Sequence, residues 1–261
     1  MGLKGTGNPA MPPYNNGPYQ WDQHLTLTKN LSLNPERFTL TENFAKRPQL
    51  NATIDQVFTV EAARACNQSF EILGTNASDD DVIFSATVGG IQLQTDGGSA
   101  DQIIVLPHLD TNLSAWTGVK WGTENQVIWE AVIRTGAIAT LTIWAGLKLT
   151  NTEVVATDDD QVYFRFDSTD DTVWKMIDSI AGTDTATASD VTVAANTNYH
   201  FRIEIDSSRK AHFFINDDEK YVSGALTDDV DLIPYIGVQS DSAATDILNI
   251  VSTQISRIIF E

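Results

Sequence analysis

The sequence from Asn198 to Asn216 reads NYHFRIEIDSSRKAHFFIN, and it decides the fold of this chain. Apolar residues occupy the odd positions from Tyr199 to Ile205, and polar residues occupy the even positions between them. This alternation is typical of a β-strand with one buried and one solvated face. A polar connection at 206–209 leads directly into a second strand at 210–216, so the stretch predicts an antiparallel hairpin.

Short strand patterns separated by turn residues recur along the rest of the chain, and no segment long enough for a helix shows a 3.6-residue period. The sequence therefore predicts an all-β fold, an antiparallel β-sandwich of jelly-roll type over residues 66–261. In the strand at 140–150 we expect Trp144 to lie exposed on a polar face, opposite the core-facing Leu141 and Leu147. The expected strands span 70–73, 82–88, 91–95, 102–106, 127–135, 140–150, 161–167, 173–180, 199–205, 211–215, 232–238 and 247–260.

The composition and irregular pattern of residues 1–65 predict an extended N-terminal arm with irregular or short-strand structure. The first 20 residues are rich in glycine, proline and asparagine and cannot form a packed element. The alternation at 37–41 allows a short strand, and we expect the arm to wrap on the body or on a partner. Aromatic and basic side chains would anchor it there. These predicted partner-binding residues are Tyr14, Tyr19, Trp21, Arg37, Phe38, Lys46 and Arg47.

The charge of the chain is strongly negative and unevenly distributed. The formal net charge is −19. Residues 1–60 hold five Lys/Arg and four Asp/Glu, which gives +1 and leaves −20 on residues 61–261. A body this acidic repels phosphates and anionic lipid, so we expect neither nucleic acid nor membrane as a partner. The only cysteine, Cys66, excludes an internal disulfide.

The order of the segments IWEAVIRT, TLTIWAGL, DDDQVYFRFDSTDDTVWKMI, the hairpin and DLIPYIGVQS resembles the concanavalin A-like jelly roll of legume lectins, laminin-G-like modules and laminarinase-type glucanases. The resemblance covers about residues 127–261, and it implies a fold more than an activity. The hairpin continues into Asn216-Asp217-Asp218, where that family usually has Asp-Gly. The combination of sandwich, arm and acidity is similar to virion proteins of tailed bacteriophages, especially capsid decoration (cement) proteins.

Catalytic patterns are poorly represented in the sequence. Glycoside hydrolysis needs two carboxylates beside the scissile bond, and glucanases of the resembled family carry Glu-x-Asp-x-x-Glu. Here Glu204-Ile-Asp206-Ser-Ser-Arg209 has arginine at the third acidic position, and Glu130 has no acid two residues away. We therefore expect no catalytic residues and no enzyme activity.

Metal ligands are also sparse. His200 and His212 lie on facing strands of the hairpin and, as cross-strand neighbours, could bind a metal with a third ligand, although an ordinary polar face is the simpler interpretation. Acidic clusters such as 158–160 and 217–219 are interpreted as solvated turns that allow at most a weak calcium site. We expect no metal site and no cofactor.

Three tryptophans are the candidates for stacking on a sugar or for an interface between subunits. Trp116 and Trp121 belong to a loop before the strand at 127–135, and Trp144 lies within a strand. Plugging the end of the sandwich is the alternative role for the loop pair.

Three hypotheses of function follow from the sequence. The leading one is a non-enzymatic phage protein, made in the host cytoplasm, that decorates the capsid exterior as a homotrimer with its arm on the major capsid protein. The alternative is a carbohydrate-binding module of a tail fibre or adhesin. The third is a laminarinase-like glycoside hydrolase, which the missing acid disfavours.

Overall fold

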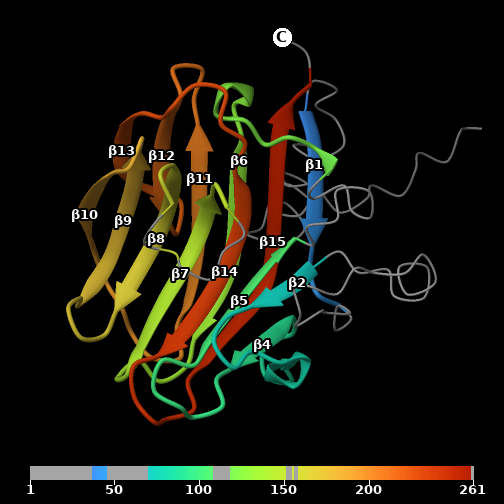
Figure 1. Cartoon of the computed structure of the whole chain (residues 1–261), viewed down its shortest axis with the longest axis vertical. Helices are drawn as coiled ribbons and strands as arrows, with labels where there is room; N and C mark the ends of the chain where they lie inside the picture. The colour runs from blue at the N-terminus through green and yellow to red at the C-terminus, as the bar shows by residue number, and fades with distance from the viewer. Residues whose placement is uncertain (1–36, 46–69, 108–117, 151–154, 156–157, 260–261) are drawn as a thin grey trace, which may run out of the picture.

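The structure is a computed structural model that describes residues 37–45, 70–107, 118–150, 155 and 158–259. Two antiparallel sheets lie one in front of the other and form a β-sandwich (Figure 1). This arrangement confirms the predicted all-β fold. The described residues contain no helix that is long and apolar enough to cross a membrane.

Sheet A has eight strands among the described residues, in the order β13-β12-β11-β6-β15-β4-β3, and β1 pairs with β15 beside this path. Its strands are β1 (Arg37–Glu42), β3 (Val82–Phe84), β4 (Ile91–Gln94), β6 (Ile128–Thr135), β11 (Asn198–Ile205), β12 (Lys210–Ile215), β13 (Asp218–Ala225) and β15 (Ile247–Ile258).

Sheet B has seven strands in the described part of the chain, in the order β10-β9-β8-β7-β14-β5-β2. Its strands are β2 (Phe70–Leu73), β5 (Gln102–Pro107), β7 (Leu141–Lys148), β8 (Gln161–Asp167), β9 (Val173–Ile180), β10 (Thr183–Thr192) and β14 (Ile233–Ser240). Two single turns of 3-10 helix, η1 (Asp79–Asp81) and η2 (Thr123–Asn125), precede β3 and β6.

The predicted hairpin is β11 and β12, and it lies within sheet A. Phe201 pairs with Ile215 and Ile203 with Phe213, so the apolar residues of both strands face the same side. β11 also pairs with β6 along its whole length, from Asn198 to Glu204.

The main core lies between the two sheets. Phe164 of β8 stacks on Phe201 of β11 with ring centroids 4.3 Å apart, and Trp174 of β9 meets the same phenylalanine edge-on at 4.8 Å. Aromatic pairs of this kind add to the free energy gained by burying their apolar area. The alternating residues of β7 that were expected to face the core, Leu141, Ile143, Ala145 and Leu147, are fully buried there.

Residues 37–45 are part of the sandwich although they fall within the predicted arm. β1 pairs with β15 from Arg37↔Ile258 to Glu42↔Thr253. The Arg37 guanidinium donates to the Gln126 carbonyl at 2.7 Å and to the Ser256 hydroxyl at 3.1 Å. Arg37 thus binds the chain's own body.

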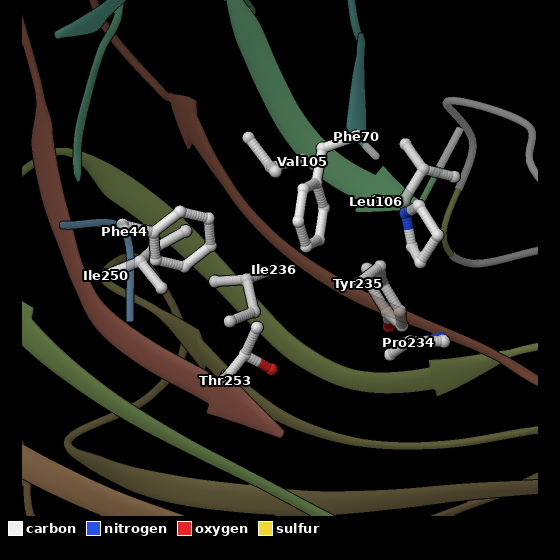
Figure 2. A pocket seen from close by; sticks show the side chains of 10 residues that line it. Phe44, Phe70, Val105, Leu106, Pro234, Tyr235, Ile236, Ile250 and Thr253 are labelled. Carbon is white, nitrogen blue, oxygen red and sulfur yellow. The ribbon is translucent and has the colours of Figure 1, made fainter. Parts of the chain in front are cut away.

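Phe38 and Phe44 pack the same segment onto the body. Phe38 stacks on Trp121 at 6.2 Å. Phe44, only 1% exposed, lies 5.5 Å from Phe70 and helps to line a small apolar pocket at the edge of the sandwich. Figure 2 shows the ring of Phe44 next to Ile250 on one side of the pocket. Ile236 lies in the middle of the view, and Leu106, Pro234 and Tyr235 lie on the other side.

Two strands, β10 and β13, were not predicted, because their sequences carry no clear apolar alternation. β10 reads TDTATASDVT and is exposed at most positions, since it pairs only with β9. β13 is likewise an edge strand, paired only with β12. An edge strand buries few side chains, so its sequence needs no alternation of apolar and polar residues by which it could be recognised.

Candidate functional site

The two outer faces of the sandwich differ in chemistry. Across sheet A a cross-strand row of polar side chains runs over β11, β6, β15 and β1. Gln254 donates its amide to the Glu130 carboxylate at 2.7 Å and accepts from the Thr41 hydroxyl at 3.4 Å. Arg202 continues the row, with its guanidinium 4.0 Å above the ring centre of Phe214.

Arg202 binds two carboxylates that are distant in sequence. Its Nη1 donates to Glu204 at 2.5 Å, and its Nε lies 3.9 Å from Glu130 on the paired strand β6. Burial raises the pKa of Glu130, although the charges of His200 and Arg202 oppose that change. Sequence spacing could not reveal this pair of acids, because strand pairing creates it. One guanidinium lies beside both carboxylates, so the three side chains keep a formal charge of −1.

The structure does not bring His200 and His212 together. His212 is opposite Glu204 and contacts Glu219 at 2.9 Å and Asp206 at 3.4 Å. His200 lies four residues before Glu204 on β11 and contacts Asp217 at 3.4 Å. Within the described residues, no group of three or more His, Cys, Asp or Glu side chains could hold a metal ion.

The glucanase-like stretch ends in a turn. Asp206 accepts hydrogen bonds from the backbone amides of Ser208 and Lys210, both at 2.8 Å. Arg209 adopts a left-handed backbone conformation (φ 60°) and pairs with Asp228 at 3.2 Å. Asp206 and Arg209 therefore have roles in the turn, in agreement with the polar connection predicted at 206–209.

The outer face of sheet B is aromatic and buried, which corrects one prediction. Trp144 was expected to be exposed on a polar strand face, but it is only 8% exposed. It belongs to a second hydrophobic cluster, separate from the main core. The cluster, called here the outer aromatic face, consists of Leu73, Ile104, Leu106, Trp144, Val155, Tyr163, Ile177 and Tyr235, with Ile233 packed against it.

Two tyrosines of this face lie on either side of β7. Gly146 of β7 pairs with Tyr163 of β8 and with Tyr235 of β14. The tyrosine rings are 6.2 Å apart and tilted by 54°. The backbone of Val162 and Tyr163 lies where a β-carbon at position 146 would be, so glycine is needed for this close approach.

Lys148 places a buried cation beside the aromatic rings. Its ammonium is 5.5 Å from the ring centre of Tyr235 and 3.8 Å from the carboxylate of Asp158. Asp158 also accepts from the backbone amide of Thr150 at 2.9 Å. Burial lowers the pKa of Lys148, and Asp158 opposes that shift.

Two polar side chains of the same region are buried without hydrogen bonds. Gln161 pairs across the strands with Lys148 and is 1% exposed, and neither atom of its carboxamide has a partner. The hydroxyl of Tyr235, also on a 1% exposed side chain, has none either. Other such atoms occur among the described residues, for example Trp129 Nε1 in the main core and Arg165 Nε on β8. Gln161 and Tyr235 lie on the two strands that flank β7.

The connection between β7 and β8 contributes to the cover of this face. Val155, which belongs to that connection, is 4% exposed and packs in the outer aromatic cluster. Asp158 of the same connection binds Lys148. The outer aromatic face is therefore closed in this structure.

The remaining predicted site residues have other positions. Trp121 is 2% exposed and packs in the main core between the two sheets. Its role agrees with the alternative of plugging the sandwich. Tyr14, Tyr19, Trp21, Lys46, Arg47 and Trp116 lie outside the described residues.

The fold is shared with solved structures at low sequence identity. A protein of unknown function from Shewanella oneidensis MR-1 is 12% identical, with a TM-score of 0.55 over 93% of this chain and 96% of that one. The β-glucanase of Bacillus licheniformis is 8% identical, with a TM-score of 0.52 over 83% and 97%. Alginate lyase A1-II', a member of polysaccharide lyase family 7, is 14% identical, with a TM-score of 0.50 over 70% and 86%.

These similarities confirm the predicted concanavalin A-like jelly roll. No protein-family model matches the chain, and no curated protein matches it significantly. The phage capsid location, the homotrimer and the major capsid protein as partner stay predictions, and so does the absence of enzyme activity.

Proposed function

We propose that this chain binds a polysaccharide on the outer aromatic face of sheet B, without cleaving it. Structures with this fold include a β-glucanase and an alginate lyase, both named for action on polysaccharides. Because fold alone does not carry function, the proposal depends on the site. The observation that carries it is the pair Gln161 and Tyr235, whose buried polar atoms lack partners beside aromatic rings.

A buried polar group without a hydrogen bond costs about 1–3 kcal/mol of stability. Leucine at 161 and phenylalanine at 235 would have similar shapes without such unpaired groups. A ligand site does need them, because ligand sites are mostly apolar and carry a few polar groups that orient the ligand. A carboxamide and a phenol can both donate to and accept from sugar hydroxyls, and aromatic rings pack against the apolar faces of sugars.

Access to the face requires Val155 to leave it, because Val155 packs in the same cluster. The Lys148–Asp158 ion pair fixes the same connection to β7. We propose that the glycan replaces Val155 against the tyrosine rings, so that binding and displacement of this side chain are coupled.

The proposal is non-enzymatic, and two buried acids of the face are held in ion pairs. Asp158 binds Lys148, and Asp171 lies 3.4 Å from Arg165 and 3.8 Å from Lys175. Glycoside hydrolysis needs one protonated acid and one free carboxylate across the sugar. Asp158 and Asp171 are held by cations and are not free for either role.

The test is affinity electrophoresis of the full chain through gels that contain soluble polysaccharide, followed by calorimetry for any polymer that retards it. We expect Tyr235→Phe and Gln161→Leu to weaken binding about tenfold, the effect of losing about 1.4 kcal/mol. Tyr221→Phe, on the edge strand β13 of sheet A, is the matched control and should bind normally. Incubation with the same polymers should release no reducing ends and no unsaturated products.

Two outcomes would overturn the proposal. One is the absence of retardation in every polymer tested, both neutral and acidic. The other is binding that Tyr235→Phe and Gln161→Leu leave unchanged, which would place the sugar elsewhere on the molecule.

A further inference from the structure

The charges around the outer aromatic face specify the class of glycan, and this inference rests on the function proposed above. Among the described residues of this face and its border, the cations are Lys148, Arg165 and Lys175, and the carboxylates are Glu71, Asp158, Asp167, Asp171, Asp184 and Asp241. Three cations therefore face six carboxylates, a formal charge of −3 for the face.

Each of the three cations is already bound to an acid. Lys148 is 3.8 Å from Asp158, and both are buried. Asp171, which is also buried, lies 3.4 Å from Arg165 and 3.8 Å from Lys175. Arg165 and Lys175 are a direct cross-strand pair, so the same carboxylate offsets both charges. An incoming carboxylate or sulfate would have to compete with these acids.

The rest of the chain reinforces this charge. The formal net charge is −19, so an approaching polyanion meets repulsion before it reaches the face. Two neutral groups at the site have buried atoms without hydrogen bonds, the carboxamide of Gln161 and the hydroxyl of Tyr235. Both suit the hydroxyl groups of an uncharged sugar, which donate and accept alike.

We infer that the outer aromatic face binds a neutral polysaccharide, such as a β-glucan, and excludes polyuronates and sulfated glycans. The two named enzymes with this fold differ in this respect, because glucan is uncharged whereas alginate carries a carboxylate on every residue. The charges of this chain favour the glucan type of ligand.

The experiment compares the full chain with laminarin and mixed-linkage β-glucan as neutral probes, and with alginate and polygalacturonate as acidic probes, at low and high salt. We expect binding to at least one neutral polymer at an affinity independent of salt, because screening acts on charge–charge attraction and a neutral ligand offers none. We expect no binding to either acidic polymer at low salt, where repulsion is strongest.

The outcomes separate this inference from the proposed function. The chain could instead bind an acidic polymer, with an affinity that salt weakens and that Arg165→Gln reduces. That result would overturn the inference that the ligand is neutral, but it would leave the proposed polysaccharide binding intact. Equal binding to both classes would overturn it too. No binding to any of the four polymers would count against the proposed function itself. The Gln161→Leu variant should lose the neutral ligand, which ties the result to this face.

Discussion

The ammonium group of Lys148 lies 3.8 Å from the carboxylate of Asp158, and the two side chains are 1% and 3% exposed. The pair joins β7 to the connection that follows it, directly beside the ring of Tyr235. A charge pair in such a place contributes little net stability, because removing both ions from water offsets their attraction. Loss of one partner is far more costly, and this asymmetry can be measured.

Replacing Asp158 with alanine should destabilise the protein by about 3–5 kcal/mol, because the buried ammonium of Lys148 loses its carboxylate. Urea unfolding followed by tryptophan fluorescence measures the change. The double variant Lys148→Met with Asp158→Ala is the control and should recover most of the loss. An Asp158→Ala protein as stable as the parent would show that the pair is not formed in solution.

Replacing Tyr235 with phenylalanine should stabilise the free protein by up to about 1 kcal/mol, because a buried hydroxyl without a partner is removed. The matched control is Tyr199→Phe. The Tyr199 hydroxyl accepts from the amide of Ala194 at 2.8 Å and donates to the Thr192 carbonyl at 3.2 Å. The control should lose about 1 kcal/mol. Thermal and urea unfolding of both variants measure the sign of the change in the free energy of unfolding. A loss of stability in Tyr235→Phe would mean that the Tyr235 hydroxyl has a partner.

Replacing Phe44 with alanine should cost about 3–5 kcal/mol, because a fully buried ring that packs on Phe70 leaves a cavity. Phe38→Ala should cost less, since Phe38 is only partly buried. Equilibrium unfolding ranks the two variants. If residues 37–45 were a detachable arm, both substitutions would leave stability unchanged.

The ion pairs of His212 should make stability depend on pH. Burial opposes protonation of His212, but the hydrogen bonds and charges of Glu219 and Asp206 outweigh it, so its pKa is raised above the usual value. A raised folded-state pKa stabilises the protein below the unfolded pKa of about 6.5, and the effect is lost as pH rises through the folded value. The free-energy difference between the parent and His212→Gln should therefore be larger at about pH 5.5 than at about pH 8.5.

The control for this prediction is Glu219→Gln, which removes the closer carboxylate. In the Glu219→Gln background, adding His212→Gln should change the free energy of unfolding less between about pH 5.5 and about pH 8.5 than it does in the parent protein. Two parallel stability–pH curves for the parent and His212→Gln would contradict the assignment.

Much of the sandwich follows from local sequence. The alternation in β11, β12 and the core-facing residues of β7 records burial against a facing sheet, since every second side chain meets the same surface. The edge strands β10 and β13 leave no such record, because their side chains meet solvent on most sides. Trp144 shows the converse limit. The residues on the same strand face as Trp144 are polar or small, so the sequence indicates a wet face. Only the packing of the outer aromatic cluster as a whole makes that face buried.

By itself, the sequence determined the all-β class, the hairpin at its centre, the acidic body and the failure of the glucanase motif at Arg209, because each depends on residues close together in the chain. Only the tertiary structure decided that Arg37 and Phe38 bind the body, that Glu130 and Glu204 share Arg202, and that Gln161 and Tyr235 flank β7 on one closed face. These relationships depend on strand pairing between segments far apart in sequence. Strand order and register across the sheets set them, and no local pattern encodes either.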